Sequence, residues 1–183
     1  DPRDFSIDWQ QLSDALSPRT RMIILNSPHN PSGALISAAE LDQLAQLIEG
    51  RDIYLISDEV YEHLVYDGVR HASVLANEAL YSKAFVVSSF GKTYHVTGWK
   101  TGYVIAPPAL SAELRKVHQY VNFCGVTPLQ WALADYMAAS PEHVEELPGF
   151  YPATRALSSA LPAPPRPSPT PPPPTSSPLP HPP

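Results

Sequence analysis

The chain has 183 residues, which is room for one domain of ordinary size. Its 12 Lys and Arg residues against 18 Asp and Glu give a formal net charge of −6, which argues against nucleic acid or an acidic membrane surface as the main partner. No apolar run has the length of a membrane span, and the single Cys124 excludes an internal disulfide and fits a reducing, cytoplasmic environment.

Short apolar runs alternate with helix-like patterns along residues 1–151. Continuous apolar runs are typical of strands that are buried on both faces of a parallel sheet. The predicted strands are 22–25, 53–56, 84–88 and 103–106. Apolar residues at helical spacing, preceded by a capping residue or Pro, predict helices. The predicted helices are 8–16 with Asp8 as the N-cap, 37–48 beginning with the capping box of Ser37 and Glu40, 111–121 capped by Ser111, 127–137, and a further helix from 140.

This alternation predicts an α/β layered fold with a mainly parallel sheet. Ligands of such sheets bind at the carboxyl ends of the strands. Asn30, Asp58 and Lys92 all lie in loops that follow predicted strands. We therefore expect these three polar groups to share one edge of the sheet.

Residues 152–183 have a different composition. They hold 14 of the 23 prolines and contain no Gly, Lys, Asp or Glu. Such a segment cannot bury a core, which predicts a disordered Pro-rich tail with polyproline II character. The run 164–167 is also compatible with a ligand for a proline-binding module. Because the change at residue 151 is abrupt, we favour the hypothesis that the tail is an out-of-frame translation product.

The loop 88–102 lies between two predicted strands and contains two lysines, Lys92 and Lys100, with hydroxyl residues and glycines between them. A loop of this kind can hold an anion and still offer one amine for covalent chemistry. The order of the two lysines does not by itself assign either role.

Four motifs together carry a resemblance to a known family. They are Asn30-Pro31-Ser32-Gly33, Ser57-Asp58-Glu59-Val60-Tyr61, Ser89-Phe90-Gly91-Lys92 and Gly98-Trp99-Lys100-Thr101-Gly102. In order and spacing, residues 1–151 resemble the class I and II aminotransferases, which are pyridoxal-phosphate enzymes of fold type I. The chain is most similar to the methionine, aromatic and kynurenine aminotransferase branch.

The resemblance implies a role for each motif. Lys92 would form a Schiff base with the pyridoxal phosphate aldehyde and then move the substrate proton. Asp58 would pair with the pyridine nitrogen and keep it protonated. Tyr61 and Asn30 would donate hydrogen bonds to the 3′-oxygen of the cofactor.

The phosphate of the cofactor would be held by Ser89 and Lys100. Many relatives carry Arg at the position of Lys100, and Lys offers a point charge in place of a bidentate fork. The site residues also have ordinary interpretations, such as an exposed lysine, a helix-capping aspartate, a turn asparagine or a packing tyrosine. We assign no catalytic role to Glu59, and the histidines show no metal-ligand spacing.

The resemblance also implies transfer of an amino group from an L-amino acid to a 2-oxo acid by a homodimeric enzyme. Residues 1–151 would form part of the three-layer α/β/α large domain that binds pyridoxal phosphate. The Gly-rich phosphate turn and the arginine for the substrate carboxylate have no counterpart in this stretch. We therefore expect a truncated chain, and an inactive aminotransferase fragment is the main alternative.

A nucleotide-binding P-loop is a second alternative, because Gly91-Lys92-Thr93 follows a predicted strand. That motif requires a Gly five residues before Gly91, where this chain has Val86. The acidic strand also precedes the lysine loop, which reverses the usual order. Both departures argue against a nucleotide-binding protein.

Overall fold

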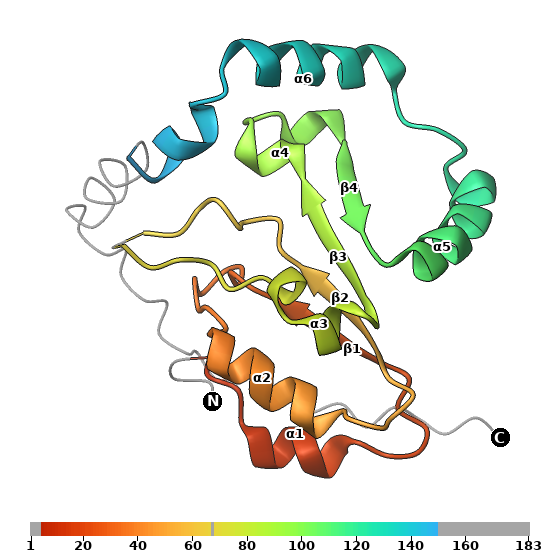
Figure 1. Cartoon of the computed structure of the whole chain (residues 1–183). Coiled ribbons are helices and arrows are strands. Elements are labelled where there is room, and N and C mark those ends of the chain that lie inside the picture. The colour runs from red at the N-terminus through yellow and green to blue at the C-terminus, as the bar shows by residue number, and fades with distance from the viewer. Residues whose placement is uncertain (1–4, 67, 150–183) are drawn as a thin grey trace, which may run out of the picture.

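The computed structural model describes residues 5–66 and 68–149. Within them, a four-stranded sheet has the order β1-β2-β3-β4 (Figure 1). The strands are β1 (Met22–Asn26), β2 (Tyr54–Asp58), β3 (Ala84–Ser89) and β4 (Gly102–Ile105). β1, β2 and β3 pair in parallel, and β4 pairs with β3 in antiparallel fashion. The predicted strands and the mainly parallel sheet are therefore confirmed.

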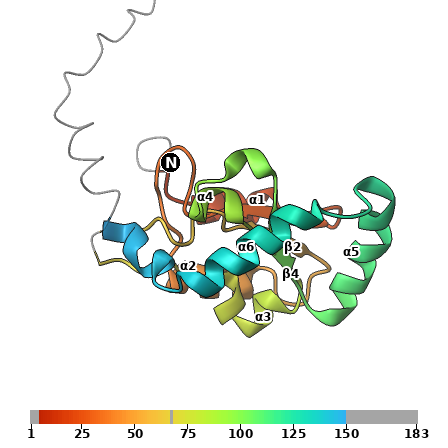
Figure 2. The ribbon, with the colours of Figure 1, turned by 90° about the horizontal axis from the view of Figure 1, so that it is seen from above.

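Helices connect the strands and follow the last of them. They are α1 (Trp9–Ala15), α2 (Ala38–Leu47), α3 (Glu78–Tyr81), α4 (Phe90–Thr93), α5 (Pro108–Val121) and α6 (Thr127–Ala139), with short 3₁₀ helices η1 (Val74–Ala76) and η2 (Thr97–Trp99). Residues 143–149 are also helical. Viewed from above, α6 crosses the middle of the molecule and α5 lies at its side (Figure 2). The Pro-rich tail predicted for 152–183 lies outside the described residues.

The predicted helix starts are mostly confirmed, with one exception. The Asp8 side chain accepts from the backbone of α1, and both bonds of the Ser37 and Glu40 capping box are present at α2. The expectation that Ser111 caps its helix is wrong, because α5 already begins at Pro108. Proline suits the first turn of a helix, where its missing N–H is not needed. Ser111 Oγ donates instead to the Ala106 carbonyl at 2.9 Å.

The hydrophobic core lies between the sheet and α1, α2, α3 and η1. The core residues of the sheet face are Leu25, Leu55, Ala84 and Val86, and those of the covering segments are Leu41, Leu44, Ile48, Ile53, Val74 and Leu80. Trp9, Leu12 and Leu16 pack against this cluster, as the sequence spacing predicts. Burial of these side chains fixes which face of each strand points inward.

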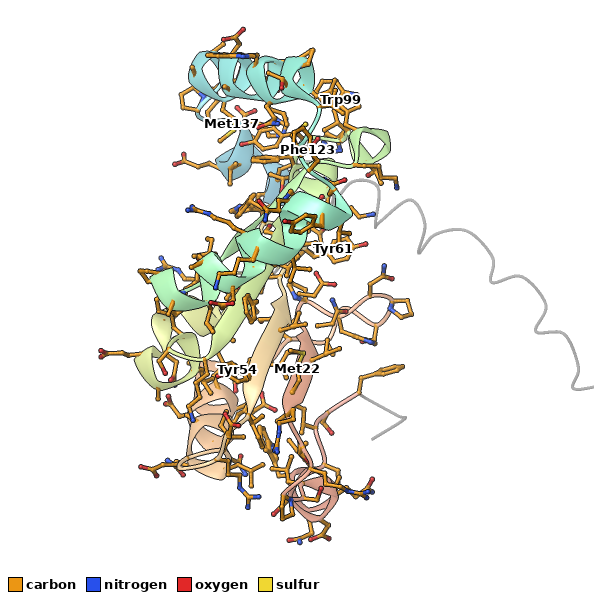
Figure 3. The ribbon with its side chains drawn as sticks, turned by 90° about the vertical axis from the view of Figure 1, so that its right-hand side faces the viewer. Met22, Tyr54, Tyr61, Trp99, Phe123 and Met137 are labelled. Carbon is orange, nitrogen blue, oxygen red and sulfur yellow. The ribbon has the colours of Figure 1, made fainter. Side chains whose placement is uncertain are left out.

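The opposite face of the sheet is open among the described residues. Met22 is the register partner of Tyr54, and Ile24 is the partner of Ile56. Ile24 is 70% exposed, Met22 45% and Tyr54 37%. Figure 3 labels Met22 and Tyr54 on these neighbouring strands. The sequence pattern predicts burial on both faces, whereas the described helices cover only one.

The pairing of β3 with β4 leaves no space at Gly102. A Cβ added there would lie 2.6 Å from the Ser88 carbonyl oxygen, which belongs to the backbone and cannot swing away. We expect Gly102→Ala to lower the free energy of unfolding by about 1–3 kcal/mol, as overpacking does. Urea denaturation measures this change. Gly98→Ala is the matched control, since nothing lies within 4 Å of its added Cβ; equal urea midpoints for the two variants would contradict the clash.

Candidate active site

The carboxyl ends of β1, β2 and β3 meet at one edge of the sheet. Asn26 ends β1 and is the register partner of Asp58, which ends β2 and is itself the partner of Val87 in β3. The loop after β1 carries Asn30, and α4 directly after β3 carries Lys92. The prediction that these polar residues lie at one edge of the sheet is confirmed.

Tyr61 contacts both Asn30, from the loop after β1, and Lys92, from α4. Asn30 Nδ2 donates a hydrogen bond to Tyr61 Oη at 2.9 Å. Lys92 Nζ lies over the Tyr61 ring, 5.6 Å from its centroid. Because an amide nitrogen has two hydrogens and a phenol keeps its own, both Asn30 and Tyr61 retain a hydrogen to donate to a ligand. Figure 3 shows Tyr61 above the ends of the strands.

Asp58 is joined to this group through Asn26. The Asp58 carbonyl accepts from Ser27 N at 3.1 Å and from Asn26 Nδ2 at 3.4 Å. Asn26 Oδ1 accepts in turn from Asn30 N at 3.0 Å. One carboxylate oxygen of Asp58 accepts from Val60 N at 3.3 Å. Sequence reasoning missed Asn26, although its position at the end of the first strand is a signal for such a role.

Helix α4 holds Lys92 and is anchored at both ends. Ser89 Oγ caps it by accepting from Gly91 N at 3.0 Å, and Thr97 Oγ1 donates to the Gly91 carbonyl at 3.0 Å. His143 Nε2 donates to the Thr93 carbonyl at 2.8 Å. The bond from His143 spans 50 residues and the other two are local, so together they hold the helix that carries Lys92 in place.

Lys100 lies further along the same loop, in a left-handed backbone conformation (φ 54°) and with an exposed side chain. Its neighbour Thr101 brings the loop back to Ser89, because the Thr101 carbonyl accepts from Ser89 Oγ at 3.4 Å and from Phe90 N at 3.2 Å. The structure therefore places the two predicted phosphate-binding residues on adjacent turns, with no hydrogen bond between them among the described residues.

A cavity of about 600 Å³ borders this loop. It is lined by residues 99–103 of the loop and β4, by His118, Asn122 and residues 124–126 around the end of α5, and by Leu133 and Met137 of α6. Trp99 and Met137 are labelled at this end of the molecule in Figure 3. Lys100 borders the cavity, whereas Asp58, Tyr61 and Lys92 do not. The cavity thus adjoins the candidate site and does not contain it.

Two glutamates tie the segment after β2 to the rest of the fold, a structural role that the sequence analysis predicted for neither of them. Glu59 is 1% exposed and accepts from Ser57 Oγ and His71 Nε2, each at 2.8 Å. Glu62 accepts from Ser88 Oγ at 2.6 Å and from Tyr103 Oη at 3.1 Å. Burial and the charge of Glu62 raise the pKa of Tyr103, so the phenol stays protonated and donates.

Burial alone would raise the pKa of Glu59, but hydrogen bonds from His71, Ser73, Val74 and Ser57 outweigh it and bring the pKa below the ordinary value of 4.5. A carboxylate with a lowered pKa stabilises the fold above the unfolded-state pKa, and this contribution is lost as pH falls through the folded-state value. We expect urea midpoints to fall as pH drops from the ordinary value of 4.5 through the lower folded-state pKa. Glu59→Gln should flatten this part of the profile, and an unchanged profile would contradict the assignment.

The P-loop alternative has no support in this geometry. Val86, where that motif needs a flexible glycine, is buried in the middle of β3. Among the described residues no group of three His, Cys, Asp or Glu side chains is arranged to hold a metal ion, and no helix is both long and apolar enough to cross a membrane.

A mainly parallel sheet with a lysine, an aspartate and a hydrogen-bonded Asn–Tyr pair at its carboxyl edge defines an α/β protein whose polar residues lie where ligands of such sheets bind. Residues 1–156 match the family model described as "Aminotransferase class I and II". The chain belongs to this family.

Two relatives illustrate the match. The chain is 55% identical to the methionine aminotransferase of Escherichia coli over 150 residues, which are 82% of this chain and 39% of that protein. It is 35% identical to kynurenine–oxoglutarate transaminase 1 of Rattus norvegicus over 148 residues, 81% of this chain and 35% of that protein. The chain therefore spans less than half the length of these relatives.

A solved structure agrees with the sequence match. The crystal structure of an Escherichia coli protein identified as a methionine aminotransferase superposes with a TM-score of 0.82 at 53% identity, over 86% of this chain and 42% of that chain. This likeness confirms the expected α/β fold of a fold type I aminotransferase and the expectation that the chain is, by family, an enzyme.

Proposed function

We propose that the protein is a pyridoxal-phosphate-dependent transaminase that moves an amino group from an L-amino acid to a 2-oxo acid. The observation that carries the proposal is the meeting of Asp58, the Asn30–Tyr61 pair and Lys92 at one edge of the sheet. The match to the methionine aminotransferase of Escherichia coli supports it.

The donor set fits pyridoxal phosphate chemically. A carboxylate at Asp58 suits a protonated ring nitrogen, and the free hydrogens of Asn30 and Tyr61 suit an anionic ring oxygen. The Ser89 hydroxyl and the Lys100 ammonium suit a phosphate. The cofactor, when bound, supplies an aldehyde that reacts with amines and a ring that accepts electrons from the substrate.

The residues then have distinct tasks. Lys92 Nζ would hold the cofactor covalently, and its free amine would take the proton from the substrate α-carbon. Lys92 Nζ lies over the Tyr61 ring, whose face attracts a cation. Asp58 would pair with the ring nitrogen and keep it protonated. Tyr61 and Asn30 would donate hydrogen bonds to the ring oxygen.

For the substrate we infer a methionine, aromatic or kynurenine-like L-amino acid, on the basis of the relatives named above. We also infer a homodimer in the cytoplasm. Large apolar side chains that stay exposed on α5 and the following loop support self-association, namely Val117, Tyr120, Val121 and Phe123. The single cysteine supports a reducing compartment.

A second candidate is that the 183-residue chain by itself catalyses nothing. The observation in its favour is the open face of the sheet, where Met22 and Ile24 of β1 are exposed. Such a face favours association or loss of order over a rigid site. Turnover by the purified 183-residue chain would exclude this candidate.

The experiment for the proposed function is an amino-transfer assay on the protein that carries this sequence. L-Methionine, L-phenylalanine and L-kynurenine are each supplied with a 2-oxo acid, with and without pyridoxal phosphate, and the new amino acid is measured. We expect transfer that depends on the cofactor. No transfer together with no cofactor binding would refute the proposal.

A further inference from the structure

Glu59 and His71 form a buried pair next to the candidate site. Successive side chains of a strand point to opposite faces, so Ser57 and Glu59 point to the helix-covered face and Asp58 to the open one. Glu59 is 1% exposed, and the His71 side chain is 9% exposed. Their contact, His71 Nε2 to Glu59 Oε2, measures 2.8 Å.

The Glu59 carboxylate collects donors from two segments of the chain. Oε1 accepts from Ser57 Oγ at 2.8 Å and from Val74 N at 3.0 Å, while Oε2 accepts from His71. His71 Nδ1 is buried without a hydrogen-bond partner among the described residues, so the polar contact of the ring is the one to Glu59. Burying a carboxylate is costly unless it is fully hydrogen-bonded, and apolar residues often stabilise a core equally well.

Glu59 also anchors the backbone between Asp58 and Tyr61. Glu59 N donates to the Val87 carbonyl of β3 at 2.9 Å, and the Glu59 carbonyl accepts from Glu62 N at 2.9 Å. Asp58 immediately precedes this anchor, and Tyr61 lies in the turn that it begins. A displacement of Glu59 therefore moves both side chains together.

We propose that Glu59 is a positioning residue whose carboxylate, held by His71, fixes the backbone between Asp58 and Tyr61 and thereby sets the direction of both side chains. The positioning itself is a property of the chain without any ligand. Only its consequence for cofactor affinity rests on the proposed function.

The first measurement is amide hydrogen exchange without cofactor, on the protein that carries this sequence. In Glu59→Gln and His71→Leu we expect exchange at residues 58–62 and 71–74 to accelerate by about tenfold or more, with Leu55 in the core unchanged. His71→Gln keeps an N–H donor and should restore the wild-type pattern. Uniform acceleration that includes Leu55, or no acceleration at all, overturns the proposal.

The second measurement is the affinity for pyridoxal phosphate, followed by absorbance. We expect about tenfold weaker binding in Glu59→Gln and His71→Leu, and near wild-type binding in His71→Gln. Glu113→Gln is the matched control, because it removes a glutamate from an exposed ion pair with Lys116 on α5. If the wild-type protein binds no pyridoxal phosphate, the proposed function fails, and the exchange pattern alone decides the positioning role. Wild-type affinity in Glu59→Gln overturns the role of Glu59 in the site.

Discussion

Lys92→Ala is expected to abolish covalent attachment of pyridoxal phosphate to the protein. Lys92 is the lysine whose amine lies over the Tyr61 ring, 5.6 Å from the centroid, on a helix anchored by Ser89 and His143. Alanine removes the only atom there that can form the bond and leaves the helix intact, since alanine is the best helix former. The measurement is borohydride reduction followed by mass spectrometry of the peptide that contains residue 92.

Two further lysine variants sharpen this result. Lys116→Ala removes an exposed lysine of α5 and should leave attachment unchanged. Lys100→Ala should retain attachment at Lys92 but weaken binding of the cofactor by about tenfold, because a phosphate loses one charge-assisted contact. Attachment that persists in Lys92→Ala and disappears in Lys100→Ala would reverse the roles of the two lysines.

Much of the fold follows from local patterns in the sequence. The apolar run that becomes β1, the capping box of Ser37 and Glu40, and Pro128 at the start of α6 are each confirmed within one or two residues. Capping and helical periodicity are short-range effects, so the sequence carries them directly. The prediction for Ser111 failed although it used the same kind of signal. Its side chain can cap a helix, but Ser111 lies in the first turn of α5 and its hydroxyl donates to the Ala106 carbonyl before the helix.

The candidate site was predictable residue by residue but not as a network. The family motifs identify Asn30, Asp58, Tyr61 and Lys92, and parallel strands bring them to one edge. The link between Asp58 and Asn30 runs through Asn26, which no motif marks. The roles themselves remain proposals, because position at an edge does not establish chemistry.

The burial of Glu59 could not be predicted, because it depends on a segment 12 residues away. A charged residue at the end of a strand is ordinarily exposed. Period-2 alternation does place Ser57 and Glu59 on one face, but only the fold shows that His71 and Val74 reach that face. The open face of β1 could not be predicted for a similar reason. An apolar run indicates a buried strand but does not say which segment covers it.

Asp58→Asn is expected to reduce amino-group transfer by at least about 100-fold, the scale on which loss of a preorganised electrostatic partner slows an enzyme. The asparagine oxygen can still accept from Val60 N, so the strand end keeps its hydrogen bond while the negative charge is lost. The pKa of the bound ring nitrogen should fall, which ¹⁵N-labelled cofactor reports by NMR without any turnover. Asp52→Asn, an exposed aspartate before β2, is the control and should leave both readouts unchanged. A ring nitrogen that stays protonated to the same pH in Asp58→Asn would mean that another group supplies the charge, and the assignment of Asp58 would then be wrong.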